Sequence, residues 1–428
     1  MIILGIETSC DETAAAILEI RNRKIEIRSN VVSSQVKIHA QYGGIVPEVA
    51  ARKHAENIIP VLNTALAALN SKSQIPNSKQ ILNSKFQVQK RIDAIAVTNG
   101  PGLITSLLVG VEAAKTLAFL WQKPLIFVNH LAGHIYANFV HDADTERRST
   151  RIKTRINADI SENQRKYLCG SALWPAICLV VSGGHTKLVL MRDFEKFEKI
   201  GQTLDDAAGE CFDKVAKILG LGYPGGPAIA AHAAQFPISK SQIPNKSQIS
   251  NSKFQIKLPR PIINSGDFNF SFSGLKTAVL YKTNSIKRRT NNKKFIQEMC
   301  YEVQQAIIDV LIEKTIRAAK KFQVKSIILG GGVVANDSLR ESFKLKIKNQ
   351  STEAHSACVL GARPSTKDLC SGLKLKINLL IPSKNLCTDN AAMIAAGGYF
   401  QLLTTKKQQW RKKFDWRKIK VDPNLEIN

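Results

Sequence analysis

Apolar and polar positions along the chain predict strands that are joined by short turns and followed by helices. The segments "IILGIETS" at 2–9 and "TAAAILEI" at 13–20 predict two strands around a polar turn. The segment "PAICLVVSGGHTKLVLM" at 175–191 predicts the same arrangement around a glycine turn. Two such turns in different halves of the chain indicate two related lobes with a nucleotide between them, because each turn offers backbone N–H groups to a phosphate. Two ordinary hairpins are the alternative.

Two further segments predict a strand, a glycine-containing turn and a helix. At 92–120, "IDAIAVTNGPGLITSLLVGVEAAKTLAFL" starts with an apolar run and continues, after a Gly/Pro turn, with apolar residues at helical spacing. At 326–343, "SIILGGGVVANDSLRESF" predicts a strand, a glycine loop and a helix, whose N-terminal amides would face a phosphate or ribose. Strands that alternate with helices predict the α/β class.

Low-complexity segments interrupt this pattern. "SKSQIPN" occurs at 71–77 and again at 239–245, and "NSKFQ" follows at the same offset both times. These segments have neither helical nor strand periodicity and are rich in Ser, Asn, Gln and Lys. We interpret 71–91, 144–167, 238–257 and 350–378 as basic loop insertions at the surface, with contact to RNA as the less favoured alternative.

Composition sets the class of protein. With 428 residues, of which 44% are hydrophobic, the chain can build a sizeable core and two domains. The net charge of +27 is concentrated in the low-complexity segments and the C-terminal region, so the rest of the chain is nearly neutral. The eight cysteines form no CxxC pair, which is typical of reduced thiols in a cytoplasm. We find no signal-peptide core and no apolar run near the length of a membrane span, and we expect a soluble cytoplasmic protein without membrane contact.

The C-terminal region interleaves aromatic and basic residues. In "KKQQWRKKFDWRKIK" at 406–420, Trp410, Phe414 and Trp416 stand among eight basic residues. Such aromatics stack on nucleic-acid bases while the cations contact phosphates. A helix that packs its aromatics on the protein and exposes its charges is the alternative.

Two histidines provide the clearest candidate chemistry. In "VNHLAGHIYANF" at 128–139, His130 and His134 lie four positions apart, so on a helix they share one face and can bind a single metal ion. The metallopeptidase pattern HExxH requires Glu after the first His, and that residue is Leu131. A peptidase mechanism is therefore disfavoured. Ordinary surface or core histidines are the alternative.

Nine motifs in order closely resemble one family, the universal tRNA N6-adenosine threonylcarbamoyltransferases, once described as glycoproteases. They are "GIETSCDET", "SSQVKIHAQYGGIVPEVAARKH", "TNGPGLITSLLVGVEAAKTLA", "NHLAGH", "LVVSGGHT", "DDAAGECFDKVAKILGLGYPGGPAI", "FSFSGLKT", "GGGVVAN" and "CTDNAAMIA". The resemblance implies a two-lobed fold of the actin, Hsp70 and sugar-kinase type, with a ribonuclease H-like core and a nucleotide cleft between the lobes. It implies transfer of L-threonylcarbamoyl from threonylcarbamoyl-adenylate to N6 of the adenosine 3′ of the anticodon, in tRNAs that read codons starting with A.

The resemblance also implies site residues. His130, His134 and Asp389 correspond to ligands of one divalent metal, for which iron(II) is favoured and zinc is possible. The residues that correspond to the family's substrate-binding positions are Val180, Val181, Ser182, Gly183, Gly184, Asp213, Gly226 and Asn336. The local sequence alone would also fit a plain type I′ or II′ hairpin at 183–184, an exposed acid at 213, a loop glycine at 226 and a helix N-cap at 336.

No catalytic side chain is certain from the sequence. Thr8, Ser9, Asp11 and Glu12 resemble the family's phosphate-side loop, and Asp11 and Glu12 are the catalytic candidates. An ordinary Asx or Ser turn is the alternative. The resemblance further implies tRNA, a paralogous subunit and a small ATPase subunit as partners. The two alternative functions are a non-catalytic nucleotide-binding partner subunit, which the presence of the metal residues argues against, and a metallopeptidase.

The same motifs predict how the lobes divide. We expect an N-terminal lobe of 1–129 plus 386–405, a C-terminal lobe of 130–385 and a basic tail of 406–428.

Overall fold

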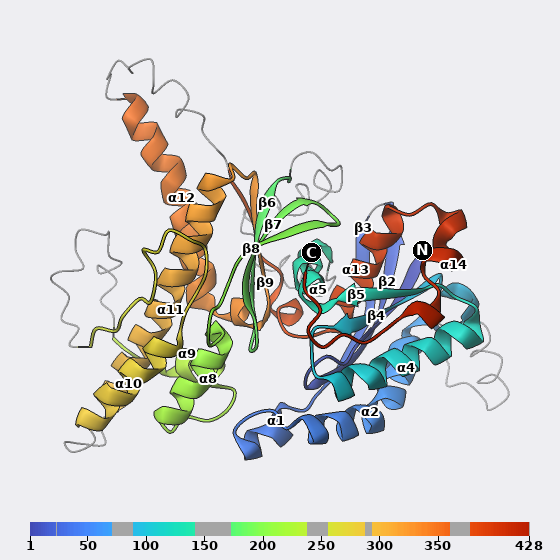
Figure 1. Cartoon of the computed structure of the whole chain (residues 1–428), viewed down its shortest axis with the longest axis horizontal. Helices are drawn as coiled ribbons and strands as arrows, with labels where there is room; N and C mark the ends of the chain where they lie inside the picture. Colours follow the sequence, from blue (N-terminus) through green and yellow to red (C-terminus); the bar gives the residue numbers. More distant parts are fainter. Residues whose placement is uncertain are drawn as a thin grey trace.

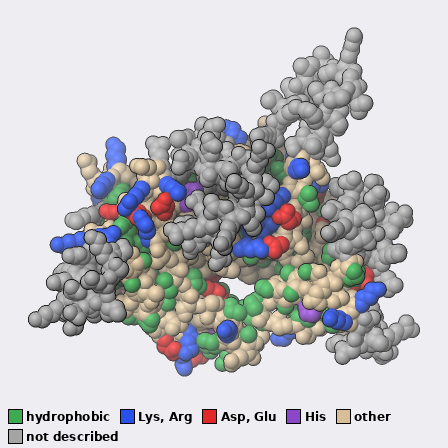
Figure 2. Space-filling model, turned by 180° about the vertical axis from the view of Figure 1, so that it is seen from behind, with side chains coloured by type: hydrophobic (Ala, Val, Ile, Leu, Met, Phe, Trp, Pro, Cys, Tyr) green, Lys and Arg blue, Asp and Glu red, His purple; other side chains and the backbone are tan. Residues whose placement is uncertain are grey.

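Two β-sheets lie side by side, each covered by helices (Figure 1). The space-filling view shows a hollow between the two halves at its lower centre (Figure 2). The structure is a computed structural model and describes residues 1–22, 24–70, 89–141, 173–237, 256–286, 293–359 and 377–427.

The first sheet has the strand order β3-β2-β1-β4-β5. Its strands are β1 (Ile2–Glu7), β2 (Glu12–Arg21), β3 (Lys24–Ser34), β4 (Ala94–Gly100) and β5 (Leu125–Asn129). β1 pairs antiparallel with β2 and parallel with β4, and β5 continues the parallel side. The predicted strand–turn–strand unit at 2–20 is confirmed, since β1 and β2 form this antiparallel pair.

The second sheet repeats the first in order and direction. Its order is β10-β9-β6-β7-β8, with β6 (Ala176–Val181), β7 (Thr186–Asp193), β8 (Lys196–Gln202), β9 (Ser326–Gly330) and β10 (Asn378–Leu380). Here β6 pairs antiparallel with β7 and parallel with β9, as β1 does with β2 and β4. The predicted α/β class and the two related lobes are confirmed by this duplication. The residue bounds of the two lobes stay a prediction.

Both faces of the first sheet are buried, because β1 sends alternate side chains to opposite sides. Leu4 and Ile6 pack with α2 (Pro47–Ala67) and α4 (Ile104–Trp121). Ile3 packs on the other face, in a cluster to which α13 (Ala391–Leu403) contributes most of its side chains. A continuous apolar run in the sequence is the expected signature of such doubly covered strands.

The core between the two sheets is shared. On one face of the second sheet, Ile177 and Leu179 pack with the helices α8 (Ala208–Ile218), α9 (Gly225–Ala234), α10 (Ser273–Ile286), α11 (Lys293–Lys321) and α12 (Asp337–Val359). On the other face, Cys178 and Val180 join the same cluster as Ile3, together with α13 and the short helix α5 (His130–Tyr136). The helix α5 therefore lies at the junction of the two halves (Figure 1).

Some of the predicted insertions proved too wide. Residues 71–88, 142–172, 238–255 and 360–376 lie outside the described residues, so the repeated segments cannot be compared with their prediction. Residues 350–359, predicted as loop, instead continue α12. Ile256 belongs to the core and its N–H donates to Glu298 Oε1 at 3.0 Å. The bounds of these insertions were predicted from Ser- and Asn-rich composition. Composition alone does not show that a helix whose first turns pack on the core continues into such a segment.

The helix α4 corrects a second expectation. It has 18 residues and is long and apolar enough to cross a membrane, contrary to the statement that no run approaches a span. In the structure it contacts β4 and α2, and its buried residues Val111, Ala114 and Ala118 belong to the cluster beneath the first sheet. A core helix passes the same test of length and composition.

The C-terminal region packs on the first sheet and then reaches the second. Instead of one helix it forms short turns at Lys407–Gln409, Trp410–Lys413 (α14) and Trp416–Lys418. Phe414 is buried, and the ring of Trp416 lies edge-on to Phe119 of α4 with 5.6 Å between centroids. The Trp410 indole N–H donates to Thr405 O at 3.0 Å. The aromatic residues of this region therefore pack on the protein, which is the second of the two alternatives. Stacking on nucleic-acid bases was the wrong expectation for Phe414, because its ring is buried.

We call residues 414–427 the C-terminal strap. Its backbone bonds to the first sheet, where Leu125 N donates to Phe414 O at 3.0 Å and Asp422 N donates to Asn99 O at 2.8 Å. Its far end reaches the second sheet, where Glu426 pairs with Lys187 of β7 at 3.0 Å and with Lys199 of β8 at 3.1 Å. The strap thus bridges the two sheets.

Candidate metal centre and the loops around it

The helix α5 begins directly after β5, and its first turn is capped. Asn129 Oδ1 accepts hydrogen bonds from Leu131 N at 2.9 Å and from Ala132 N at 3.3 Å. An Asn cap satisfies amides that otherwise lack an intrahelical partner, and so fixes where the helix starts. His130 and His134 consequently stand one turn apart on the same face, as predicted from their spacing.

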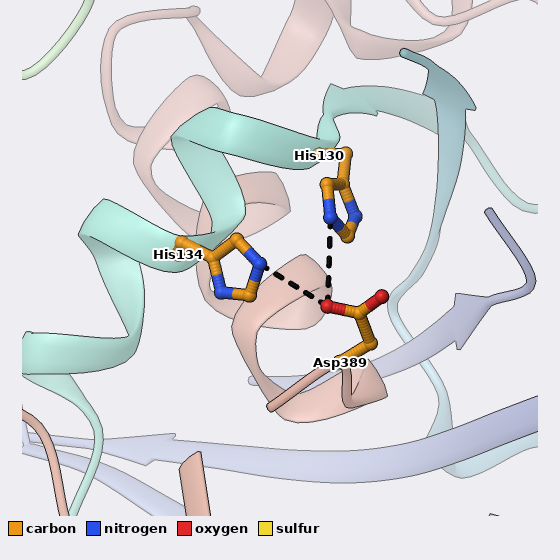
Figure 3. Close-up of side chains that lie close together, drawn as sticks. All are labelled: His130, His134 and Asp389. Carbon is orange, nitrogen blue, oxygen red and sulfur yellow. Dashed lines mark ion pairs between the residues drawn. The ribbon is translucent and has the colours of Figure 1, made fainter. Parts of the chain in front are cut away.

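Asp389 completes the group from a distant part of the sequence. It precedes α13, which packs so closely on α5 that a Cβ on Gly133 would lie 2.8 Å from Ile394 Cδ1. Asp389 Oδ1 lies 3.1 Å from His134 Nε2 and 3.5 Å from His130 Nε2 (Figure 3). The three ligand atoms lie within 4.8 Å of one another. The predicted trio is therefore brought together.

The donor set fits a divalent metal ion. Both ring nitrogens of His134 are buried and lack a hydrogen-bond partner, although Nε2 is close to the carboxylate. A buried polar atom without a partner costs free energy unless something binds it. Two imidazole nitrogens and one carboxylate oxygen form a donor set that iron(II) and zinc accept.

Charges within the group are strongly coupled. Burial opposes the charged form of His130, but the carboxylates of Asp389 and Glu7 outweigh it and raise the pKa of His130 to about 9. Burial likewise opposes ionisation of Asp389, yet the positive charge of His130 holds the pKa of this carboxyl well below its usual range. Asp389 is therefore an ionised ligand whose charge is balanced by the proton on His130.

The turn between β1 and β2 lies next to the centre. Ser9 Oγ is 3.0 Å from His130 Nδ1. Burial, reinforced by the charges of Asp11 and Asp389, raises the pKa of Glu12 well above its usual range. Glu12 also accepts a hydrogen bond from Ser34 Oγ at 3.2 Å. Glu12, one of the two catalytic candidates, is thus close enough to both Asp11 and Asp389 to interact with them electrostatically.

The glycine hairpin of the second sheet has an unexpected turn. Ser182 N donates to His185 O at 2.8 Å across it, but neither Gly183 nor Gly184 has the left-handed φ that type I′ or II′ turns require. A Cβ on either glycine would meet no protein atom within 4 Å. Neither backbone conformation nor packing therefore explains these two glycines.

The strands on either side of the hairpin are tightly packed. The side chains of Val180 and Val181 are buried in the two main clusters, so only their backbone atoms could line a site. Gly331, with φ +97°, lies against Val181, where a Cβ would stand 2.3 Å from the carbonyl oxygen. A Cβ on Gly330 would stand 2.7 Å from His134 O. The glycine loop after β9, the end of β6 and the helix α5 therefore lie in direct contact.

The remaining predicted substrate residues surround the same end of the second sheet. Asp213 Oδ1 accepts from Gly225 N at 2.7 Å at the start of α9, and burial raises the pKa of Asp213. Gly226 has open space where a Cβ would be. Burial raises the pKa of Tyr223, and the charges of Asp11 and Asp213 raise it further. The loop before α9 therefore lies near the turn between β1 and β2.

Asn336 has the structural role that its sequence position allowed. Its Oδ1 accepts from Leu339 N at 3.1 Å at the start of α12, and its Nδ2 donates to Gln304 Oε1 at 2.8 Å. The N-cap alternative is therefore realised.

Two residues near the centre were not predicted from the sequence. Glu7 is fully buried and lies 3.3 Å from His130 Nδ1. A charged residue within an otherwise buried strand is the signal that could have identified it. His185 is the second, because burial and the charges of His130 and Lys187 lower its pKa to about 4. His185 lies within the motif "LVVSGGHT", but the substrate-binding positions implied by the resemblance end at Gly184.

Comparisons with known proteins agree with the motifs. The sequence model of the family described as tRNA N6-adenosine threonylcarbamoyltransferase matches residues 26–147 and 165–396. A protein of that name from Syntrophomonas wolfei is 46% identical, over 93% of this chain and 92% of its own length. Proteins of that name from Thermosipho melanesiensis and Bacillus subtilis are 42% and 41% identical, over 93% of this chain and 94% and 90% of theirs. The chain belongs to the tRNA N6-adenosine threonylcarbamoyltransferase family.

Proposed function

We propose that this chain transfers an L-threonylcarbamoyl group from threonylcarbamoyl-adenylate to N6 of an adenosine in tRNA. The adenosine is the one 3′ of the anticodon, in tRNAs that read codons starting with A. The observation that carries the proposal is the buried group of His130, His134 and Asp389 at the junction of the two sheets, in a chain 46% identical to a relative with this name.

His130, His134 and Asp389 would hold one divalent ion, with iron(II) favoured over zinc. Such an ion would act as a Lewis acid and polarise a carbonyl or phosphate oxygen. The nitrogens of His134 support this assignment, since both are buried without a hydrogen-bond partner and Nε2 lies 3.1 Å from Asp389 Oδ1.

The chemistry asks the protein mainly for positioning. The N6 amine of adenine is a weak nucleophile because its lone pair is delocalised into the ring. The donor is already activated, so N6 attacks the carbamoyl carbon, the bond from that carbon to the phosphate oxygen breaks, and AMP leaves. Holding the two bound substrates in the reactive orientation supplies a large part of the rate acceleration. Asp11 and Glu12 are the candidates for accepting the proton that N6 loses.

The glycines support where the donor binds. Gly183, Gly184 and Gly226 have empty space at the Cβ position, in contrast to Gly330 and Gly331, which the packing requires. We infer that the backbone at 180–184 lines the acyl-adenylate, with Asp213, Gly226 and Asn336 around its adenosine. Asp213 and Asn336 also accept hydrogen bonds from the starts of α9 and α12. They would therefore position these helix starts as well as contact the ligand.

The alternatives have less support. A peptidase of the HExxH type would need a carboxylate where Leu131 stands. A non-catalytic subunit would have no use for the three clustered ligands. We further propose, from the family resemblance, that the chain acts in the cytoplasm with a paralogous subunit and a small ATPase subunit.

Nucleoside analysis of tRNA tests the proposal. The chain replaces the endogenous enzyme in cells, and the modified adenosine is measured by mass spectrometry. We expect Asp389→Asn to abolish the modification and to lower the bound metal, because it removes the only carboxylate of the described ligand group. Glu341→Gln, the same change at an exposed pair with Lys344, is the matched control and should preserve both. Full modification by Asp389→Asn without bound metal would contradict the proposal.

A further inference from the structure

The alternation of side chains along β1 places the Glu7 side chain on the face of the strand that points toward α5. Along β1, Leu4 and Ile6 face α2 and α4, whereas Ile3 and Gly5 face α13. A Cβ on Gly5 would lie 2.2 Å from Ala391 O, so the strand and α13 are in direct contact there. Because side chains two positions apart share a face, Glu7 points into the space between the sheets, where α5 lies.

Three donors converge on the buried carboxylate of Glu7. Ser9 N donates to Oε1 at 2.5 Å, and Thr98 Oγ1 donates to Oε2. The third contact is His130 Nδ1, 3.3 Å from Oε2. Each carboxylate oxygen thus accepts a hydrogen bond from a donor other than His130, which favours the ionised form of a side chain that is fully buried.

An ionised carboxylate can only accept hydrogen bonds, so its contact with His130 requires the proton to be on Nδ1. Ser9 Oγ, also near Nδ1 at 3.0 Å, can accept from the same N–H. When the ring is neutral and its one proton is held on Nδ1, the lone pair that a metal ion needs is on Nε2, the nitrogen that faces Asp389 at 3.5 Å.

We propose that Glu7 is a positioning residue for the metal centre, which holds the proton of His130 on Nδ1 and presents Nε2 to the ion. The inference rests on the proposed metal centre. A carboxylate behind a ligating imidazole fixes the orientation of the ring and makes it a better ligand. A merely structural ion pair between Glu7 and His130 would affect stability without affecting metal affinity.

Glu7→Gln tests the proposal at almost constant volume. In the wild type, three donors share the two carboxylate oxygens of Glu7. The amide of Gln has only one oxygen, and its NH₂ group, which is itself a donor, would face one of these donors. We expect Zn²⁺ affinity, measured by competition with a chelator, to fall about 10- to 100-fold. Glu19→Gln is the matched control, because Glu19 is a carboxylate of the same sheet that is 7% exposed and pairs with Arg21 and Arg28. It should change thermal stability but leave Zn²⁺ affinity unchanged.

Nitrogen NMR of the wild-type protein gives a second readout that does not depend on the variant folding. With ¹⁵N-labelled histidine and Zn²⁺ bound, His130 should show a proton on Nδ1 and none on Nε2. A His130 ring that carries its proton on Nε2 would overturn the proposal, as would unchanged Zn²⁺ affinity in folded Glu7→Gln.

The outcomes separate the two proposals. If wild-type protein binds no divalent metal, the metal centre itself fails. If Asp389→Asn loses Zn²⁺ while Glu7→Gln binds it like the wild type, only the role of Glu7 fails.

Discussion

His130 is a residue whose surroundings pull its charge in two directions. Burial favours the neutral ring, and two carboxylates, one on either side, favour the charged one. The carboxylates win, so without metal the ring is protonated at neutral pH. A metal ion binds only the unprotonated nitrogen, and therefore competes with this proton.

The competition predicts a pH dependence of metal affinity. Below the His130 pKa of about 9, each ion bound displaces a proton, so Zn²⁺ affinity should fall roughly tenfold per pH unit between pH 9 and pH 7. The sign follows from the raised pKa, since a lower pH favours the protonated, metal-free ring. Chelator competition at pH 7, 8 and 9 measures it. An affinity that is flat with pH would show that His130 is not protonated in the metal-free protein.

At the scale of elements, the sequence predicted best where one pattern had one structural solution. The hairpins and the helix at 104–121 followed from periodicity and turn residues, whereas a helix at the paired histidines was only the condition under which they share a face. Asp389 could be joined to His130 only through the resemblance, because the packing of α13 against α5 is a contact between distant segments. Glu7 was missed because it ends an apolar strand, and the position of that end relative to α5 depends on sheet pairing.

The C-terminal region at 406–420 shows the opposite case, in which one pattern had two solutions. Aromatic residues among basic ones suit both RNA stacking and packing on a protein surface. The choice depends on whether an apolar site is available, and Phe119 of α4 and the cluster around Phe414 provide one. No local property of 406–420 contains that information.

Packing of the strap makes a prediction about stability. Phe414→Ala should lower the free energy of unfolding by about 3–5 kcal/mol, because it empties a buried aromatic site. Lys412→Ala, two positions away on the exposed side, should change it by less than about 0.5 kcal/mol. Urea denaturation of the purified variants measures both. Equal, small effects of the two substitutions would mean that the strap does not pack on the sheet in solution.

For the whole molecule, the shared core matters more than either sheet alone. Cys178 and Val180 of the second sheet and Ile3 of the first belong to one cluster, and α5 lies within it. Any change in the angle between the sheets must therefore act on the helix that carries both histidines. The strap adds a second connection, since Asn129, the cap of α5, also donates to Glu426 O at 3.2 Å.

The place of α13 in the chain has a consequence for how the protein is made. A ribosome delivers the strands of both sheets before it delivers Asp389 and α13, whose buried residues close one face of the first sheet. Domains usually fold as they emerge, N-terminal part first. Here the first half of the chain must wait for a helix from the end, and the metal centre cannot form on a partial chain. A fragment that stops at residue 385 should bind no Zn²⁺ and should be cut rapidly by protease within 24–70 and 89–141, where the full chain should resist. Equal resistance of the two in these ranges would show that the first sheet completes its folding without α13. If the proposed metal centre forms, metal loading would be a step after translation, and the cell would have to supply the ion to newly released chains.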